Sequence, residues 1–150
     1  MNREEFEARM GNRVDVEVWD AFLGPMATIS REAGLSDDAV VDDYKVHGHS
    51  RILRALVPYA VDAMARAMCQ EAENKDVRER VDLASKLLLH LADQVPEDGD
   101  RKLAVRARQV AHENMGDREA ITYKVMNGLR LTPYDQEYIL RRIGGKEDGR

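Results

Sequence analysis

The sequence has little of the residue types that cross-link, interrupt or anchor small folds. It holds one cysteine, four prolines and 5% aromatic residues in 150 positions. A single cysteine excludes an intramolecular disulfide, so we expect a reducing compartment, with Cys69 as a small buried apolar residue. No apolar run is long enough to span a bilayer, and the first ten residues carry carboxylates where a signal peptide needs cations. These absences predict a cytoplasmic protein without a membrane partner.

Alternating runs of β-branched residues are also absent, which argues against a sheet. Leu, Ile, Val, Met and Ala are plentiful instead and favour helices. A chain of this length can bury roughly 68 to 70% of the surface of its unfolded form, enough for a core of its own. We predict an all-α protein with a helix-turn-helix-like N-terminal part at 1–49, a central amphipathic helical hairpin at 50–96, basic C-terminal helices at 97–145 and a disordered tail at 146–150.

Charge is unevenly distributed along the chain. Residues 1–50 hold eleven carboxylates against five lysines and arginines, residues 51–100 hold ten against seven, and residues 101–150 hold seven against eleven. The three thirds therefore carry −6, −3 and +4, which make up the net charge of −5. Because acidic surfaces repel polyanions, any attraction to phosphate is expected from the last third.

The N-terminal part is predicted to be a series of short helices. Asn2 caps a helix that Gly11 ends, and residues 14–23 carry an apolar helical face up to a break at Gly24-Pro25. Residues 27–46 then form two helices around a tight turn at Gly34, with Ser36 as the cap of the second helix. This is the outline of a helix-turn-helix.

The second helix of such a corner would present its first residues to the major groove of DNA. Here these residues are Ser36, Asp37, Asp38, Val41 and Asp42. Three aspartates without a nearby cation are repelled by the DNA backbone before any base is contacted. The pattern therefore favours a packing element or a protein contact over a direct reader of bases.

The central hairpin has the most regular pattern. Its first helix opens at Ser50 and contains Pro58, which should kink or split it. After a turn at 73–75, the apolar positions of the second helix recur at spacings of four, three, four, three and four: Val77, Val81, Ala84, Leu88, Leu91 and Val95. Such a seam holds one partner helix, and Leu87 widens it toward a second neighbour. The predicted oligomerisation residues are Leu53, Val57, Met64, Leu87, Leu88 and Leu91.

The last third follows an acidic loop at 96–100, a candidate hinge. Asp117 is predicted to cap a helix with Ile121 and Val125 facing inward, and a final helix runs from Thr132-Pro133 to Gly144-Gly145 with Tyr138, Ile139 and Ile143 packed. The candidate phosphate-binding residues lie on the helix after the loop: Arg101, Lys102, Arg106 and Arg108. The alternative for these four cations is a solvated face that balances the acidic loop.

Catalytic signals are absent from the sequence. No glycine-rich phosphate loop follows a strand, and no serine or cysteine stands in a nucleophile motif, so we predict neither an enzyme nor a cofactor. His47 and His49, near Asp42 and Asp43, are the one grouping that resembles metal ligands. A third and fourth ligand at a recognisable spacing are missing, so an inter-helix turn is favoured over a metal site.

Residues 54–95, taken as one unit, resemble a pattern of bacteriophage small terminase subunits. There a helix with an L-V-type start is followed by an acidic turn and then V-R-x-x-A-A-x-x-L-L. Here the second part stands as Val77-Arg78, Val81, Ala84, Leu87 and Leu88. The helix-turn-helix outline at 27–46 is similar to the N-terminal DNA-binding domain of that family.

The resemblance implies a ring-forming, non-catalytic component of a viral DNA-packaging motor. The hairpin would mediate oligomerisation, the N-terminal part would bind double-stranded DNA and the C-terminal part would contact the large terminase subunit. The aspartates at 37, 38 and 42 depart from this pattern, so we expect the phosphate contacts at Arg101, Lys102, Arg106 and Arg108 instead. The alternative is an acidic helical adaptor, inhibitor or regulatory protein that binds another protein through its first half, without nucleic acid.

Overall fold

The computed structural model describes residues 1–46, 48–70 and 75–147, and it holds helices and no strand within these ranges. The predicted all-α class is confirmed. The elements are α1 (Arg3–Met10), α2 (Val16–Val18), the π-helical turn η1 (Trp19–Leu23), α3 (Gly24–Glu32), α4 (Asp37–Lys45), α5 (Ser50–Gln70), α6 (Lys75–Gln94), α7 (Arg101–Met115), α8 (Asp117–Met126) and α9 (Pro133–Glu147).

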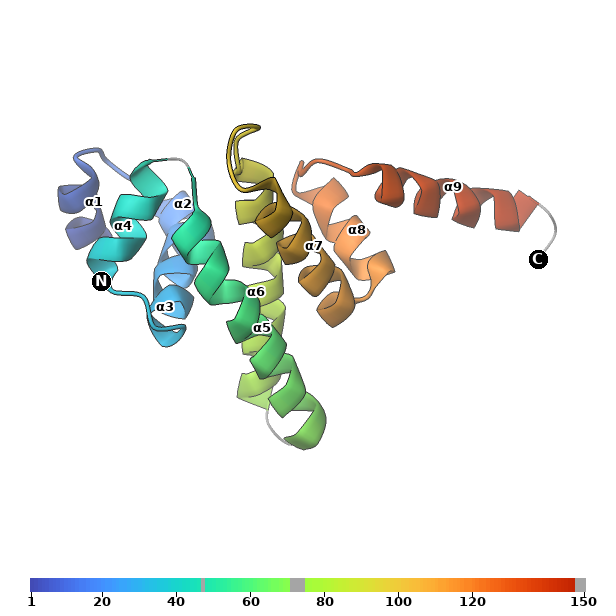
Figure 1. Ribbon diagram of the computed structural model, residues 1–150, viewed down its shortest axis with the longest axis horizontal. Coiled ribbons are helices and arrows are strands. Elements are labelled where there is room, and N and C mark those ends of the chain that lie inside the picture. Colours follow the sequence, from blue (N-terminus) through green and yellow to red (C-terminus); the bar gives the residue numbers. More distant parts are fainter. Residues whose placement is uncertain (47, 71–74, 148–150) are drawn as a thin grey trace.

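The helices are arranged around the central pair α5 and α6 (Figure 1). Helix α7 packs along both α5 and α6. The short helices α1 to α4 lie on the side of the α5–α6 pair that faces away from α7. Helix α8 lies against α7, and α9 leads away from the body of the molecule (Figure 1). One apolar core runs through these layers, from Phe6 in α1 to Ala120 in α8.

The predicted caps of the first helix are confirmed. The Asn2 side chain accepts a hydrogen bond from the backbone N–H of Glu5, and Gly11 adopts a left-handed conformation that ends α1. Ser36 caps α4 by accepting from the N–H of Ala39, and Gly34 forms the turn before it with φ of 100°. The resemblance of α3 and α4 to a DNA-binding corner stays a prediction.

The predicted break at Gly24-Pro25 is wrong, because the chain stays helical from Val16 to Glu32. The N–H of Gly24 bonds to the carbonyl of Trp19, five residues back, so the turn before the proline is wider than in an α-helix. A wider turn tolerates Pro25, whose ring would otherwise meet a carbonyl of the preceding turn. Glycine is needed at position 24, since a Cβ there would lie 3.0 Å from the Trp19 carbonyl oxygen.

The aspartates of the α3–α4 corner have cationic neighbours that the sequence analysis did not foresee. Asp37 pairs with Arg31 at 2.6 Å, and Asp38 pairs with Arg9 at 3.2 Å. The Arg31 hydrogen bond lowers the pKa of the Asp37 carboxyl. Val41, at one of the positions expected to face DNA, is buried in the core. The acidic charge of this corner is thus partly neutralised within the chain.

The hairpin is confirmed as two amphipathic helices, and Pro58 does not split the first of them. The turn predicted at 73–75 lies outside the described residues except for Lys75, which begins α6. The residues predicted to oligomerise are packed inside the single chain: Leu53, Val57, Leu87, Leu88 and Leu91 are buried and Met64 is half-buried. Their role between chains stays a prediction. Cys69 is exposed, contrary to the prediction, because its position on α5 turns it away from α6 and α7.

The C-terminal helices differ from the prediction in four details. Gly116 rather than Asp117 is the N-terminal cap of α8, and Val125 is exposed while Lys124 takes the inward position. Helix α9 begins at Pro133 as predicted, but it continues through Gly144-Gly145 to Glu147. Ile143 is exposed rather than packed, because α9 leads away from the rest of the chain (Figure 1).

No helix in the described part of the chain is both long enough and apolar enough to cross a bilayer.

Candidate functional site

The four predicted phosphate-binding residues all lie on α7 but do not share one face of it. A helix turns by about 100° per residue, so Arg101 and Arg108 project within roughly 20° of each other, whereas Lys102 and Arg106 project roughly 100° to 160° away from them. Lys102 and Arg106 are exposed. In the described part of the chain, the ion pairs of α7 involve Arg108 and His112 and not Lys102 or Arg106.

Arg108 is held against the end of the hairpin. Its guanidinium donates to the carbonyl of Ala92 at 3.3 Å and lies 3.7 Å from the Asp93 carboxylate. Burial lowers the pKa of Arg108, the nearby Asp93 opposes this, and the positive charges of Arg101 and Arg130 lower the pKa further. Three guanidinium groups therefore lie in one region with the carboxylates of Asp93 and Asp135.

Arg101 and Arg108 line a pocket of about 700 Å³ on this face of α7. The remaining wall comes from α8 and the start of α9, with Lys124, Pro133, Tyr134 and other residues around it. The volume lies in the range of pockets that hold small ligands. Arg101 and Arg108 lie at its edge, and Lys124 and Asp135 lie at its base.

The floor of the pocket is a buried ion network that joins three helices. Lys124 of α8 and Asp135 of α9 are 2% and 0% exposed, and Lys124 Nζ donates to Asp135 Oδ2 at 2.8 Å. The same ammonium lies 2.8 Å from His112 Nε2 of α7. An ammonium only donates, so Nε2 must accept and the imidazole proton sits on Nδ1.

The network continues to the pocket wall through Asp117. His112 Nδ1 lies 2.9 Å from Asp117 Oδ1, and the Tyr134 hydroxyl donates to Asp117 Oδ2 at 2.6 Å. These two hydrogen bonds lower the pKa of the Asp117 carboxyl, and the same carboxylate raises the pKa of Tyr134. Asp117 is therefore held ionised between α7 and α9 instead of capping α8.

Asp135 has a double role at the start of α9. Burial raises the pKa of its carboxyl, but hydrogen bonds from Lys124 and from the backbone N–H of Thr132 outweigh burial, so the pKa lies below its ordinary value. Its own N–H donates to Thr132 Oγ1 at 3.2 Å, and this reciprocal pair is a capping box. This network was not predicted from the sequence. The Thr132-x-x-Asp135 spacing was a signal for the cap, but nothing marked Lys124 as a buried partner.

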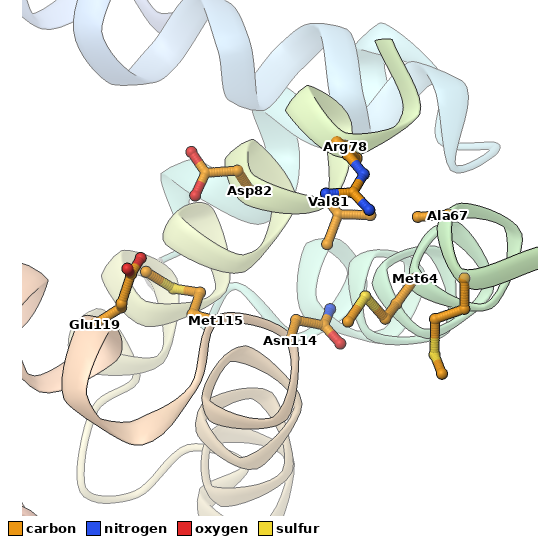
Figure 2. A pocket seen from close by; sticks show the side chains of 9 residues that line it. Met64, Ala67, Arg78, Val81, Asp82, Asn114, Met115 and Glu119 are labelled. Atoms are coloured by element: carbon orange, nitrogen blue, oxygen red, sulfur yellow. The ribbon is translucent and has the colours of Figure 1, made fainter. Parts of the chain in front are cut away.

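A second, smaller hollow lies between the lower half of the hairpin and the junction of α7 and α8, and Figure 2 shows it. Its volume is about 260 Å³, and its lining is rich in methionine and has charged side chains at its rim: Met64, Ala67, Met68, Arg78, Val81, Asp82, Asn114, Met115 and Glu119. We call it the methionine groove. Asn114 closes one end by donating to the Ala60 carbonyl and to Ser85 Oγ, both at 3.3 Å.

The grouping of His47, His49, Asp42 and Asp43 resembles metal ligands in the sequence, and the structure gives His49 and Asp43 other contacts. His47 lies outside the described residues, and the His49 ring is buried and stacks on Tyr44 with centroids 5.1 Å apart. Asp43 accepts a hydrogen bond from the N–H of Ile52 at 2.9 Å and so caps α5. Among residues 1–46, 48–70 and 75–147, no three His, Cys, Asp or Glu side chains lie close enough to hold a metal ion.

Comparisons with protein-family models, with curated proteins and with solved structures find no match to this chain.

Proposed function

We propose that the protein is a non-catalytic, homo-oligomeric component that binds double-stranded DNA, of the kind that phage small terminase subunits represent. Its partners would be DNA and a large terminase subunit in the cytoplasm of the host cell. The observation that carries the proposal is the exposed pair Lys102 and Arg106 on one side of α7, with Arg101 and Arg108 on another side of the same helix.

The electrostatic environment of α7 supports a phosphate contact. Arg130 adds a further cation beside Arg101 and Arg108. Lys102 and Arg106 are free to reach a ligand without breaking an ion pair inside the described part of the chain. Arg108 contributes mainly to the potential, because its guanidinium is occupied by Ala92 and Asp93. We therefore expect Lys102 and Arg106 to make the contacts and Arg101 to assist.

Titration of duplex DNA at several salt concentrations tests this assignment. The logarithm of the binding constant should fall linearly with the logarithm of salt, and each lost phosphate contact should lower the slope by about one. We expect the double variant Lys102→Ala with Arg106→Ala to bind more weakly and with a slope smaller by about two. The matched control is Arg13→Ala with Lys75→Ala, which removes the same charge from exposed positions on other elements.

Equal losses in the two double variants would mean that net charge, not the α7 face, decides binding. Absence of any salt-dependent binding would reject the DNA proposal and favour the alternative, a helical adaptor that binds another protein. The exposed apolar side chains of α9 favour that alternative. Asp37 and Asp38 are paired with Arg31 and Arg9, which argues against the acidic first half of the chain as the surface that binds such a partner.

A further inference from the structure

Helix α9 carries an apolar stripe that its own chain leaves open. Leu140 is 68% exposed and Ile143 is 51% exposed, and Ile139 is half-buried. Residues three and four apart share a side of a helix, so Ile143 neighbours both Leu140 and Ile139 and the three form one stripe. Beyond the first turn, α9 leads away from the other helices (Figure 1). A helix of this length is only marginally stable alone in water, so the stripe calls for a partner.

The methionine groove is an apolar hollow of a size that suits side chains rather than a small molecule. Its volume of about 260 Å³ falls below the usual range for ligand pockets. Met68 is 71% exposed beside it, although methionine is an apolar residue. Flexible thioether side chains adapt to the shape of an inserted leucine or isoleucine. Figure 2 shows Met64 and Met115 on facing sides of the hollow.

We propose that α9 of one copy of the protein docks in the methionine groove of a second copy. Charge complementarity supports this pairing. Arg142 and Glu137 lie on opposite flanks of the α9 stripe by helical geometry. The groove has Arg78 and Asp82 of α6 on one side and Glu119 of α8 on the other (Figure 2). Within one chain Glu137 pairs with Arg141 at 2.6 Å, and Arg142 donates to the Tyr138 hydroxyl at 2.8 Å. With the stripe in the groove, Arg142 can turn to Glu119 and Glu137 can turn to Arg78.

The occupant is a second copy because α9 is fixed in a direction that leads away from its own groove. The buried Lys124–Asp135 pair holds the first turn of α9 against α8, and the rest of the helix extends outward (Figure 1). Each copy then offers one helix and one groove, so the contact is head-to-tail and generates a ring or an open chain. This inference names the interface for the homo-oligomer of the proposed function and rests on that part of it.

The mass of the full chain in solution, measured by light scattering, tests the interface. We expect an assembly for the unaltered chain and monomers for two double variants, Leu140→Glu with Ile143→Glu on α9 and Met68→Glu with Arg78→Glu at the groove. The control, Val125→Glu with Met126→Glu, changes exposed apolar residues of α8 outside both surfaces and should keep the assembly. Mixing the two monomeric variants leaves one intact helix and one intact groove, and it should give a 1:1 dimer and nothing larger.

Oxidative cross-linking gives an independent measurement, because it does not require glutamate substitutions that could unfold the chain. In a Cys69→Ser background, Met68→Cys with Leu140→Cys should form disulfide-linked species larger than one chain, and Met68→Cys with Val125→Cys should not. A monomeric unaltered chain would overturn the inference.

An assembly that keeps its mass in the α9 and groove double variants would reject this interface alone. An intact assembly without salt-dependent DNA binding would reject the DNA function alone.

Discussion

The central hairpin and the α8–α9 junction are stabilised in opposite ways. The hairpin and α7 meet through apolar side chains such as Leu53, Leu88 and Val110, all fully buried. The junction instead meets through Lys124 and Asp135, which are as deeply buried but charged. Apolar burial tolerates small changes in geometry, while a buried ion pair depends on both partners being present. The two regions should therefore fail under different changes.

Removing one partner of the buried pair is the largest expected effect. Lys124→Met leaves the Asp135 carboxylate buried without its ammonium and should cost about 3 to 5 kcal/mol of the free energy of unfolding. Urea denaturation measures the loss. The matched control is Lys124→Met with Asp135→Asn, in which the neutral amide keeps an acceptor for the Thr132 N–H and no unpaired charge remains, and it should recover most of the stability. A double variant as unstable as the single one would mean that shape, not charge, is the cause.

In the hairpin, truncation of a core leucine should cost a similar or smaller amount. Leu88 is fully buried, so Leu88→Ala should lower the free energy of unfolding by about 2 to 5 kcal/mol through lost burial and a cavity. The same urea titration applies, with Met126→Ala as the control at an exposed apolar residue outside both proposed contact surfaces. Leu87→Asp should also unfold the chain, since Leu87 is buried. A folded Leu87→Asp protein would contradict this packing.

Acid should act on the junction and spare the hairpin. The folded pKa of Asp135 lies below its ordinary value, so the ionised carboxyl stabilises the fold at neutral pH and loses this contribution as pH falls through the folded pKa. Asp135→Asn cannot titrate. The stability difference between the unaltered chain and this variant should be largest near neutrality and shrink below about pH 4. A difference that stays constant would show that the carboxyl charge contributes nothing.

The smallest expected effect concerns the cap of α9. Thr132→Ala removes the oxygen that accepts from the Asp135 N–H and should cost about 1 kcal/mol. Hydrogen exchange of the first turn of α9 should rise, while exchange in the hairpin stays the same. Thr132→Ser keeps the hydroxyl and should behave like the unaltered chain. An unchanged exchange rate in the alanine variant would contradict the capping role.

The apolar regions were predictable from the sequence, and the charged ones were not. The spacing from Val77 to Val95 predicts α6 because burial of a stripe needs only residues at three and four apart. The caps at Asn2 and Ser36 follow from local rules in the same way. The Lys124–Asp135 pair joins residues eleven positions apart across a turn, and no periodicity encodes which carboxylate meets which ammonium.

The cations of α7 were also predictable only in part, because their contacts depend on other helices. Helical spacing identifies Arg101, Lys102, Arg106 and Arg108 as residues of one helix. It does not show that Arg108 turns back to Ala92 and Asp93, or that Arg130 joins it from the loop after α8. These contacts depend on the tertiary packing of α6, α7 and α8. The local sequence pattern therefore predicted the helix, but it did not predict which of its four cations are exposed and which contact the rest of the chain.

Helix α9 is fixed to the rest of the chain at its first turn, so a small rotation there moves its far end by a larger distance. Fifteen residues span roughly 22 Å along the axis, and the fixed end sits at the Lys124–Asp135 pair. A rotation of about 10° at this pivot displaces the far end by roughly 4 Å, close to the spacing of neighbouring side chains on a helix. The geometry of the Lys124–Asp135 pair therefore determines the direction of α9 and the position of its distal half. In an assembly formed through α9, the same geometry would determine the curvature.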